Sequence, residues 1–533
     1  MHHTKPRLSQ DDVGKLIALW AVLIGAFLYL YQPWLAGFPI NDGGLFYSMI
    51  RTIQQNDFQL PQQVAYNGLS IPFAYPPLAL YLGALLSSLL HLDPITILQW
   101  LPACILIAIS ITFYFLARRL LDSPIAAGIA TFLYMCTPRS ATWLIMGGGL
   151  TRGFGHLFLL LTVLHVYSLY TRRERRYIYL STMAGSLVVL THPEAALHTV
   201  AACALCWIIK GRTRRATLDS LWIGAGVALV TAIWWVPVLL RHSGAPFVAA
   251  GGTGWEFTVN LIKPLFLTFS EEPMMTLVPV LGLIGLAASL ARNEYFLPAW
   301  FGLPFLVDPR SAATVAIVPG VLLAAKALDG VIFPGIAGKQ SVTTWAEIPG
   351  PYHRPAVRLL LSFLGVYMLI MALYAGMELS RVRVSPENRT AFNWVAQHTP
   401  LGSRFIILDG TTEMFCSPVQ EWFPAITARI SQTTIQGYEW VGNGRFFERL
   451  TGLQDMQLCQ YEIEPGACVL NKAAALGLDF DYVYVTRQTA LTHDCRTGTE
   501  RHIGDEMVNE LLAGGGYATV YETEAVEILG VVP

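Results

Sequence analysis

The chain has 533 residues, of which 54% are apolar and only 13% are charged. Ordinary soluble domains carry about 25% charged residues, so this composition excludes a soluble, a disordered or a fibrous protein and predicts a membrane protein. Charge also divides the chain: residues 1–378 hold 24 basic and 17 acidic residues, whereas residues 379–533 hold 11 basic and 19 acidic ones. The basic residues form short clusters without interleaved aromatic residues, so we expect no nucleic-acid partner.

Apolar runs of the length that a membrane requires dominate residues 1–378. A helical crossing needs roughly 20 apolar residues, and we expect a polytopic α-helical bundle of about 11–13 spans. The first run lacks the small-residue cleavage site of a signal peptide, which predicts a retained anchor. The twelve runs lie near 14–37, 75–91, 95–117, 123–137, 153–170, 177–191, 194–210, 216–240, 274–291, 295–307, 311–328 and 356–377.

Positive charge predicts the orientation of this bundle, because Lys and Arg in short loops stay on the cytoplasmic side. The basic clusters include residues 118–119, 172–176 and 210–215. All of the clusters fall on one side if run 75–91 is not a full independent crossing. We therefore expect that run to be re-entrant, membrane-parallel or balanced by another crossing. The sequence predicts an integral, multi-pass membrane protein with a cytoplasmic N-terminus and an extracytoplasmic region 379–533.

Three predicted outer segments are long enough to build a site. The long first outer loop, 38–75, carries apolar residues at helical spacing within 45–53, which predicts an amphipathic helix in the membrane interface. The second segment, 137–154, and the third, 241–273, mix aromatic residues with glycine. Non-helical backbone at membrane depth persists only where it lines a cavity or is buried in protein, so these segments are expected to surround a functional site.

The region after residue 378 has the pattern of a soluble α/β domain. Short β-rich apolar runs occupy 404–410 and 480–486, and a helix that begins at Pro386 precedes the first of them. A helix with a glycine stop precedes a last strand near 518–521. Alternating helices and strands favour this fold class.

Two features of the α/β region leave alternatives open. The aromatic-rich segment 421–440 suits a surface for carbohydrate or a partner, or the core of the domain, and we favour the core. Cys416, Cys459, Cys468 and Cys495 could form two disulfides in an oxidising compartment, with pairings that the sequence does not decide.

Asp42 is the first candidate site residue. It lies in FPINDGG, five residues beyond the first apolar run, where two glycines let the backbone approach a ligand closely. A carboxylate there can take a proton from an acceptor nucleophile or hold a divalent cation such as Mg²⁺ or Mn²⁺. The alternative is a helix N-cap, because Asp before a helix accepts backbone N–H bonds. One residue can have both roles.

Four further ionisable residues are candidates for binding a phosphate or a substrate. Arg152 follows the glycine run in GGGLTRGFGH, with His156 one helical turn later, and an arginine beside backbone N–H groups at a helix start suits a phosphate or pyrophosphate. The alternative is a lone interfacial arginine with a helix-packing glycine run. His192 and Glu194 interrupt an apolar stretch in THPE, and ionisable groups at membrane depth predict a functional site. Here the alternative is a polar turn between two helices.

Taken in order, these features resemble one family. A first span, an acidic residue right after it in FPINDGG, an amphipathic helix, PFAYPPLALYLGALL and FYFLARRLLDSPIAAGIATFLYMCTP are similar to the N-terminal module of GT-C glycosyltransferases. That superfamily includes oligosaccharyltransferase catalytic subunits, protein O-mannosyltransferases and the aminoarabinose transferases of lipid A. The resemblance implies a multispan enzyme that transfers a sugar from a polyprenyl-phosphate or polyprenyl-pyrophosphate carrier to an acceptor on the outer or lumenal side.

The resemblance also implies roles and partners. Asp42 corresponds to the first-loop catalytic carboxylate, His192 lies where relatives often have a basic residue near the carrier phosphate, and Arg152 is a looser match. The family's first acid is often paired with a neighbouring acid, and here that neighbour is Asn41. In the implied inverting transfer, Asp42 activates an acceptor hydroxyl or amide while Arg152 and His192 stabilise the departing lipid phosphate. The partners are then a polyprenyl-linked sugar donor, a protein, glycan or lipid acceptor, and membrane lipids.

Two other functions stay open. A non-catalytic GT-C-like subunit of a membrane complex would keep the bundle and use the outer domain to bind partners, and the missing paired acid favours it. A transporter of lipid-linked sugars would show two related halves with discontinuous helices, and the sequence shows no such symmetry. The sequence leaves the sugar, the acceptor, the carrier and the metal dependence undecided.

Overall fold

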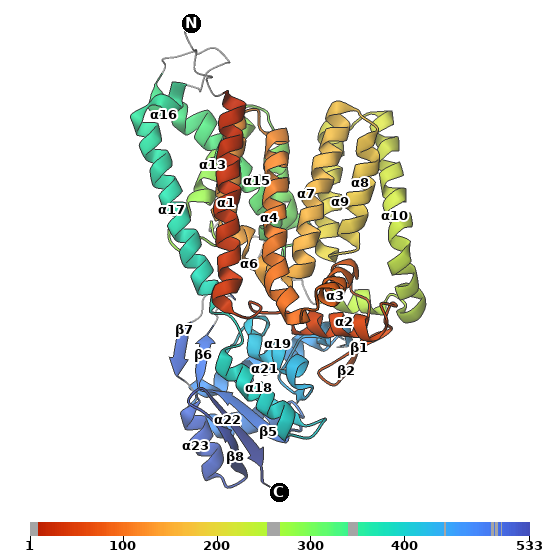
Figure 1. Cartoon of the computed structure of the whole chain (residues 1–533), viewed down its shortest axis with the longest axis vertical. Helices are drawn as coiled ribbons and strands as arrows, with labels where there is room; N and C mark the ends of the chain where they lie inside the picture. The colour runs from red at the N-terminus through yellow and green to blue at the C-terminus, as the bar shows by residue number, and fades with distance from the viewer. Residues whose placement is uncertain are drawn as a thin grey trace.

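The computed structural model describes residues 9–252, 267–338, 350–441, 444–491, 495, 499–502 and 504–532. A long helical bundle forms one end of the molecule, and a mixed α/β domain forms the other (Figure 1). Part of the third predicted outer segment, residues 253–266, lies outside the described residues.

Polar side chains determine where several bundle helices begin. Ser9, Asp93, Ser123 and Thr213 each accept a hydrogen bond from a backbone N–H two or three residues further on, which satisfies a donor that a helix start leaves unpaired. The bundle consists of α1 (Gln10–Ala36), α4 (Pro94–Leu120), α5 (Pro124–Cys136), α7 (Gly149–Arg172), α8 (Arg176–Val189), α9 (Pro193–Lys210), α10 (Arg214–His242), α13 (Leu277–Ala291), α14 (Phe296–Val307), α15 (Ala312–Ala327) and α17 (Pro355–Ser380), with the short α6 (Thr142–Ile145), α11 (Ala245–Gly251) and α16 (Phe333–Ala337).

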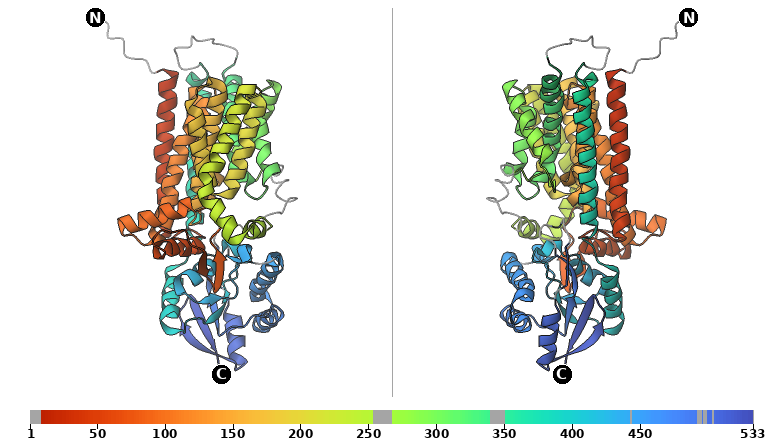
Figure 2. Two further views of the ribbon diagram at one scale, coloured as in Figure 1. Left: turned by 90° about the vertical axis from the view of Figure 1, so that its right-hand side faces the viewer. Right: turned by 90° about the vertical axis from the view of Figure 1, so that its left-hand side faces the viewer.

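All twelve apolar runs of the sequence form helices. Among the described residues, six helices are long and apolar enough to cross a membrane, and the chain is an integral multi-pass membrane protein. Run 75–91 forms α3 (Leu78–Leu90), which extends sideways from the bundle near the α/β domain (Figure 2). The choice among the three alternatives for this run stays a prediction. The six long helices are α1, α4, α7, α10, the continuous stretch Ala312–Ala337, and α17.

The first outer loop folds into α2 (Gly44–Gln55) and a hairpin of β1 (Gln63–Tyr66) and β2 (Leu69–Pro72). The predicted amphipathic helix is therefore present. Its apolar residues Leu45, Met49, Ile50 and Ile53 are buried, because the helix packs against α3 on one side and α19 (Pro418–Thr427) of the α/β domain on the other. Protein covers much of the face that the sequence assigned to the membrane interface.

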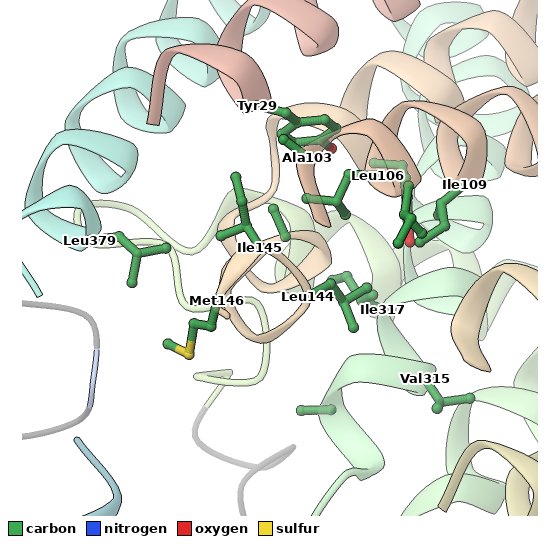
Figure 3. Packing of buried hydrophobic residues seen from close by; sticks show 14 of the residues in the cluster. Tyr29, Ala103, Leu106, Ile109, Leu144, Ile145, Met146, Val315, Ile317 and Leu379 are labelled. Carbon is green, nitrogen blue, oxygen red and sulfur yellow. The ribbon is translucent and has the colours of Figure 1, made fainter. Parts of the chain in front are cut away.

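The backbone between α5 and α7 enters the middle of the bundle. Leu144 and Ile145 of α6 and the following Met146 are buried among side chains such as Tyr29 of α1 and Ile317 of α15 (Figure 3). Polar backbone groups have no water partners at such a position, so they must bond within the protein. This segment leads into the glycine run at residues 147–149.

A five-stranded sheet forms the centre of the α/β domain. Its strand order is β4-β3-β5-β9-β8, in which β3 pairs in parallel with β4 and β5 while β9 runs antiparallel to β5 and β8. The two strands predicted at 404–410 and 480–486 are β3 and β5. The strand predicted as the last one is β8, but β9 follows it and lies inside the sheet, which the sequence interpretation missed. The strands are β3 (Arg404–Leu408), β4 (Ile430–Ser431), β5 (Tyr482–Thr486), β8 (Tyr517–Glu522) and β9 (Val526–Val531), with a separate hairpin of β6 (Gln488–Leu491) and β7 (Thr499–His502).

Alternate residues of the central strands face two different cores. Phe405 and Ile407 of β3 belong to a core that is continuous with the membrane bundle, whereas their neighbour Ile406 packs in a second core on the opposite face. Because α19 belongs to the first core, it lies between the sheet and the first outer loop. The domain helices are α18 (Pro386–His398), α19, α20 (Tyr438–Val441), α21 (Phe446–Leu458), α22 (Pro465–Ala475) and α23 (Asp505–Ala513).

Two disulfides cross-link the α/β domain. Cys416 pairs with Cys495, and Cys459 pairs with Cys468. These pairings answer the question that the sequence left open. They also agree with an oxidising compartment for this domain.

Candidate active site

The segment that carries Asp42 is held between two distant parts of the chain. Ile40 forms an antiparallel bridge with Arg383, which follows α17, and the backbone N–H of Asn41 donates to the carbonyl of Val382 at 2.7 Å. On the other side, the N–H of Gly147 donates to the carbonyl of Ile40 at 2.9 Å. Backbone hydrogen bonds thus immobilise the chain immediately before Asp42.

Both carboxylate oxygens of Asp42 have partners from the glycine-run region. Oδ1 accepts the backbone N–H of Gly148 at 2.8 Å, and Oδ2 accepts a guanidinium N–H of Arg152 at 2.7 Å. A Cβ on Gly147 would lie 2.0 Å from the Asp42 carbonyl oxygen, and one on Gly148 would lie 2.6 Å from Oδ2. Only glycine fits at these positions, so the glycine run packs on the Asp42 segment.

Arg152 has a second partner. Its Nε donates to the carbonyl of Trp143 at 2.8 Å, and its guanidinium lies 5.8 Å from the centre of the Trp143 ring. The side chain is therefore oriented by α6 while it bonds Asp42. A phosphate ligand would have to share this arginine with Asp42.

A second acid reaches the same segment from the α/β domain. Glu421 of α19 is buried, and its Oε1 accepts the N–H groups of Gly43 at 2.9 Å and Leu45 at 3.4 Å. Burial, followed by the negative charge of Asp42, raises the pKa of Glu421 to about 8. The site thus contains two neighbouring carboxyl groups, although the residue next to Asp42 in sequence is Asn41.

Tyr75 connects this region with His192. Its hydroxyl lies 3.0 Å from Oγ1 of Thr151, one residue before Arg152, and its ring centre lies 6.5 Å from the centre of the His192 ring. Trp440 of α20 packs on the same tyrosine at 6.0 Å. Desolvation raises the pKa of Tyr75, so the hydroxyl keeps its proton.

The two candidate histidines have different hydrogen-bond partners. His192 precedes α9, and its Nδ1 accepts the N–H of Ala195 at 3.3 Å, while its Cβ lies 2.6 Å from the position that a Cβ on Gly155 would take. His156 is buried inside the bundle, where its Nε2 lies 3.1 Å from the hydroxyl of Tyr134. The phosphate roles of both histidines stay predictions.

Glu194 belongs to a second polar cluster at the start of α9 and α15. Its carboxylate lies 3.8 Å from Nε of Arg310, whose side chain is 51% exposed. Ser311 donates to Asp308 at 2.5 Å and also lies 2.8 Å from Nε2 of His198. Desolvation raises the pKa of Glu439 in α20, and the charge of Arg310 is among the influences that lower it, so Arg310 acts on the α/β domain as well.

The described residues offer little support for a metal at Asp42. Its two oxygens already accept hydrogen bonds, and no group of three or more His, Cys, Asp or Glu side chains that could hold a metal ion occurs in the part of the chain that the structure describes. The divalent cation considered from the sequence stays a prediction.

Solved structures with the same architecture cover nearly the whole chain. The archaeal oligosaccharyltransferase AglB from Archaeoglobus fulgidus, in complex with an inhibitory peptide and a dolichol-phosphate, matches 96% of this chain and 79% of its own, with 13% identity and a TM-score of 0.55. ArnT from Cupriavidus metallidurans bound to undecaprenyl phosphate matches 97% of this chain and 98% of its own, with 13% identity and a TM-score of 0.54. The chain has a GT-C fold.

Two further comparisons match this chain, one over nearly its whole length and one over residues 74–305. The mycobacterial arabinofuranosyltransferase AftD matches 99% of this chain and 42% of its own, with 15% identity and a TM-score of 0.56. A family described as 6-pyruvoyl-tetrahydropterin synthase related domain, membrane protein, matches residues 74–305. No curated protein matches the sequence.

The sequence patterns did not identify three residues of this region as site candidates. Glu421 lay in a segment that was assigned to the core, and its neighbour Trp422 is indeed buried there. Tyr75 ends the first outer loop without any local motif. Arg310 lies in the short stretch between two apolar runs, next to the acid Asp308, and a solitary cation at a span end was the signal that could have found it.

Proposed function

We propose that the chain is a glycosyltransferase that transfers a sugar from a polyprenyl-phosphate or polyprenyl-pyrophosphate carrier to an acceptor at the membrane face next to the α/β domain. The observation that carries the proposal is the carboxylate of Asp42, held by the N–H of Gly148 and by Arg152 where the bundle meets the α/β domain of a GT-C fold. The carriers bound to AglB and ArnT support the choice of donor class.

In this proposal Asp42 is the general base. It takes the proton of an acceptor hydroxyl or amide while the acceptor oxygen or nitrogen forms a bond to the anomeric carbon of the sugar. The bond from that carbon to the carrier phosphate breaks, and the phosphate leaves with the electron pair. Arg152 orients Asp42 and, with His192, stabilises the charge that develops on the phosphate.

Arg310 adds an accessible positive charge to this scheme. It forms a loose ion pair with Glu194 at 3.8 Å, and half of its side chain is exposed. A guanidinium that is not tightly bonded can take a phosphate in bidentate fashion at low cost. We assign Arg310 to the carrier phosphate and Glu194 to holding Arg310, while His156 has no role in the proposal because Tyr134 engages it.

The proposed orientation places the α/β domain outside the cytoplasm. The two disulfides require an oxidising compartment. Helix α1 begins at the end of the bundle away from the α/β domain (Figure 1), and Arg118 near the end of α4 forms an ion pair with Asp11 there, which suits a cytoplasmic side. A cysteine-labelling assay on intact cells, with an impermeant maleimide and a cysteine introduced at exposed Ile463 or at Arg173, tests this orientation.

The test of the activity is the release of polyprenyl phosphate from a mixture of radiolabelled polyprenyl-phosphate sugars in proteoliposomes. Asp42→Asn keeps one acceptor oxygen, which can serve Gly148 or Arg152 but not both, and its amide cannot act as a base, so we expect turnover to fall by at least about 10²-fold while the protein still folds. Asp57→Asn is the matched control, since Asp57 is an exposed residue of the same loop in a left-handed conformation that Asn also adopts. Equal turnover in the two variants would refute the role of Asp42.

A non-catalytic subunit is the second candidate, favoured by the engagement of both Asp42 oxygens in the structure. In that case the wild-type protein turns over no donor across a range of acceptors although it is folded. Purification from mild detergent would then retain a membrane complex in constant proportion.

A further inference from the structure

Helix α19 of the α/β domain contacts the chain on both sides of Asp42. Oε1 of Glu421 accepts the N–H groups of Gly43 and Leu45, just after Asp42. Nε1 of Trp422 donates to the carbonyl of Asn41 at 3.0 Å, just before Asp42. Two consecutive residues of one helix therefore fix the backbone that presents the proposed base.

The glycines after Asp42 pack closely against α19. Gly43 has a φ of +128°, which side-chain-bearing residues rarely adopt, and a Cβ there would lie 2.9 Å from the Trp422 ring. A Cβ on Gly44 would lie 2.4 Å from the carbonyl oxygen of Glu421. That same carbonyl accepts the hydroxyl of Tyr66 at 2.7 Å, so the first outer loop holds α19 from a second point.

The α/β domain in turn holds α19 rigidly. Ser417 caps its N-terminus by accepting the N–H of Gln420, and the side-chain amide of Gln420 donates to the carbonyl of Ile407 in β3 at 2.9 Å. Trp422 and Phe423 are fully buried. The position of Glu421 is consequently set by the central sheet.

Burying an ionisable carboxyl group at this position costs free energy of folding. Glu421 is 5% exposed, its carboxyl oxygen accepts backbone N–H groups, and, in addition to burial, Asp42 and Glu439 both raise its pKa electrostatically. A glutamine would accept the same two N–H groups without placing a second acid beside the first. The arrangement is therefore a paired-acid site assembled from two parts of the chain that are 379 positions apart in the sequence, from Asp42 to Glu421.

We propose that Glu421 is the second acid of the site, a positioning residue that orients Asp42 through Gly43 and Leu45 and makes turnover depend on docking of the α/β domain. The activity part of this inference rests on the proposed transferase function. The positional part does not, because it concerns the mobility of the Asp42 segment.

The experiment compares Glu421→Ala, Glu421→Gln and the matched surface variant Glu448→Gln in full-length protein reconstituted in nanodiscs. Glu448 is exposed on α21 of the same domain. Hydrogen exchange of residues 38–55 measures, without any substrate, how firmly Glu421 holds the Asp42 segment. Turnover of the radiolabelled donor mixture gives kcat and KM.

We expect Glu421→Ala to speed exchange at residues 43–45 by at least about tenfold, because two amides lose their acceptor, and to lower kcat by about tenfold or more while KM for the donor changes less than about threefold. Glu421→Gln restores slow exchange and part of kcat, since its amide oxygen accepts the same N–H groups. Glu448→Gln behaves as wild type in both measurements.

Several outcomes would overturn the inference. If Glu421→Ala exchanges at the wild-type rate, Glu421 does not hold residues 43–45. If exchange is faster but kcat is unchanged, the contact does not affect turnover. If Glu421→Ala does not fold, Glu421→Gln decides: wild-type kcat there leaves no role for the second carboxyl. If no protein turns over donor but the exchange rates differ as expected, the transferase proposal fails, and the positioning of residues 43–45 by Glu421 is still supported.

Discussion

Two arginine–carboxylate pairs lie at the end of the bundle that meets the α/β domain, and they are built differently. Arg152 bonds Asp42 at 2.7 Å with its side chain 23% exposed, and Trp143 orients it. Arg310 lies 3.8 Å from Glu194 and is 51% exposed. A tight, oriented pair fixes the geometry of its acid, whereas a loose, exposed pair leaves the cation available to a ligand. In the proposed function, this difference separates the general base from the phosphate site.

The largest expected effect is on the tight pair. Arg152→Gln should lower kcat by about 10–10²-fold with little change in KM for the donor, because Asp42 loses the partner that orients it. Arg152→Lys should recover only part of kcat, since a lysine cannot bond both Asp42 and the Trp143 carbonyl in the planar arginine geometry. Steady-state kinetics of the three proteins in proteoliposomes measures this. A rise in KM alone would make Arg152 a donor-binding residue.

The loose pair should respond in the opposite way. Arg310→Gln should raise KM for the donor about tenfold with kcat largely preserved, because one charged hydrogen bond to a phosphate contributes about 1.5–3 kcal/mol. Binding of undecaprenyl phosphate in nanodiscs should weaken by a similar factor. Unchanged binding together with a lower kcat would erase the distinction between the two pairs.

The backbone beside the tight pair offers a stability test. Gly147→Ala should destabilise the protein by about 1–3 kcal/mol, because its Cβ would lie 2.0 Å from the Asp42 carbonyl oxygen and the buried segment must shift. Gly302→Ala in α14 is the control, as no atom lies within 4 Å of its added Cβ. Thermal unfolding in detergent compares them. Equal unfolding temperatures would mean that the Asp42 segment is not held against the glycine run.

The last test concerns the second acid of the site, Glu421, whose carboxyl group accepts backbone N–H groups. Its pKa rises on folding to about 8 from an unfolded value of 4.5, so the folded state binds the extra proton more tightly and wild-type stability declines as pH rises from about 4.5 through 8. Glu421→Gln lacks this decline. Relative to the variant, the wild type should therefore lose free energy of unfolding between about pH 4.5 and 8, by less than about 1.4 kcal/mol per pH unit crossed. The unfolding temperature of the variant should rise relative to that of wild type over this range. A constant gap between pH 5 and 9 would contradict the assignment.

Local patterns were sufficient to predict the helices of the bundle. Apolar runs require helices wherever backbone groups have no water, and all twelve runs are helical. β9 was missed because its run follows β8 closely and contains Gly530, so its place inside the sheet depends on pairing with β5. The charge distribution left three arrangements open for run 75–91, and the structure shows that α3 extends sideways from the bundle.

The sequence by itself determined a multispan bundle, an α/β domain after it, and Asp42 at the end of the first span, because hydropathy and local turns are properties of neighbouring residues. Only the tertiary structure decided that Gly148 and Arg152 bond Asp42, that His156 is engaged inside the bundle, and that Glu421 arrives from another domain. The partners in these contacts lie 22 to 378 positions apart, so they leave no local pattern. Each partner is set by the packing of whole helices and sheets. The second acid was absent beside Asp42 in the chain and present beside it in space.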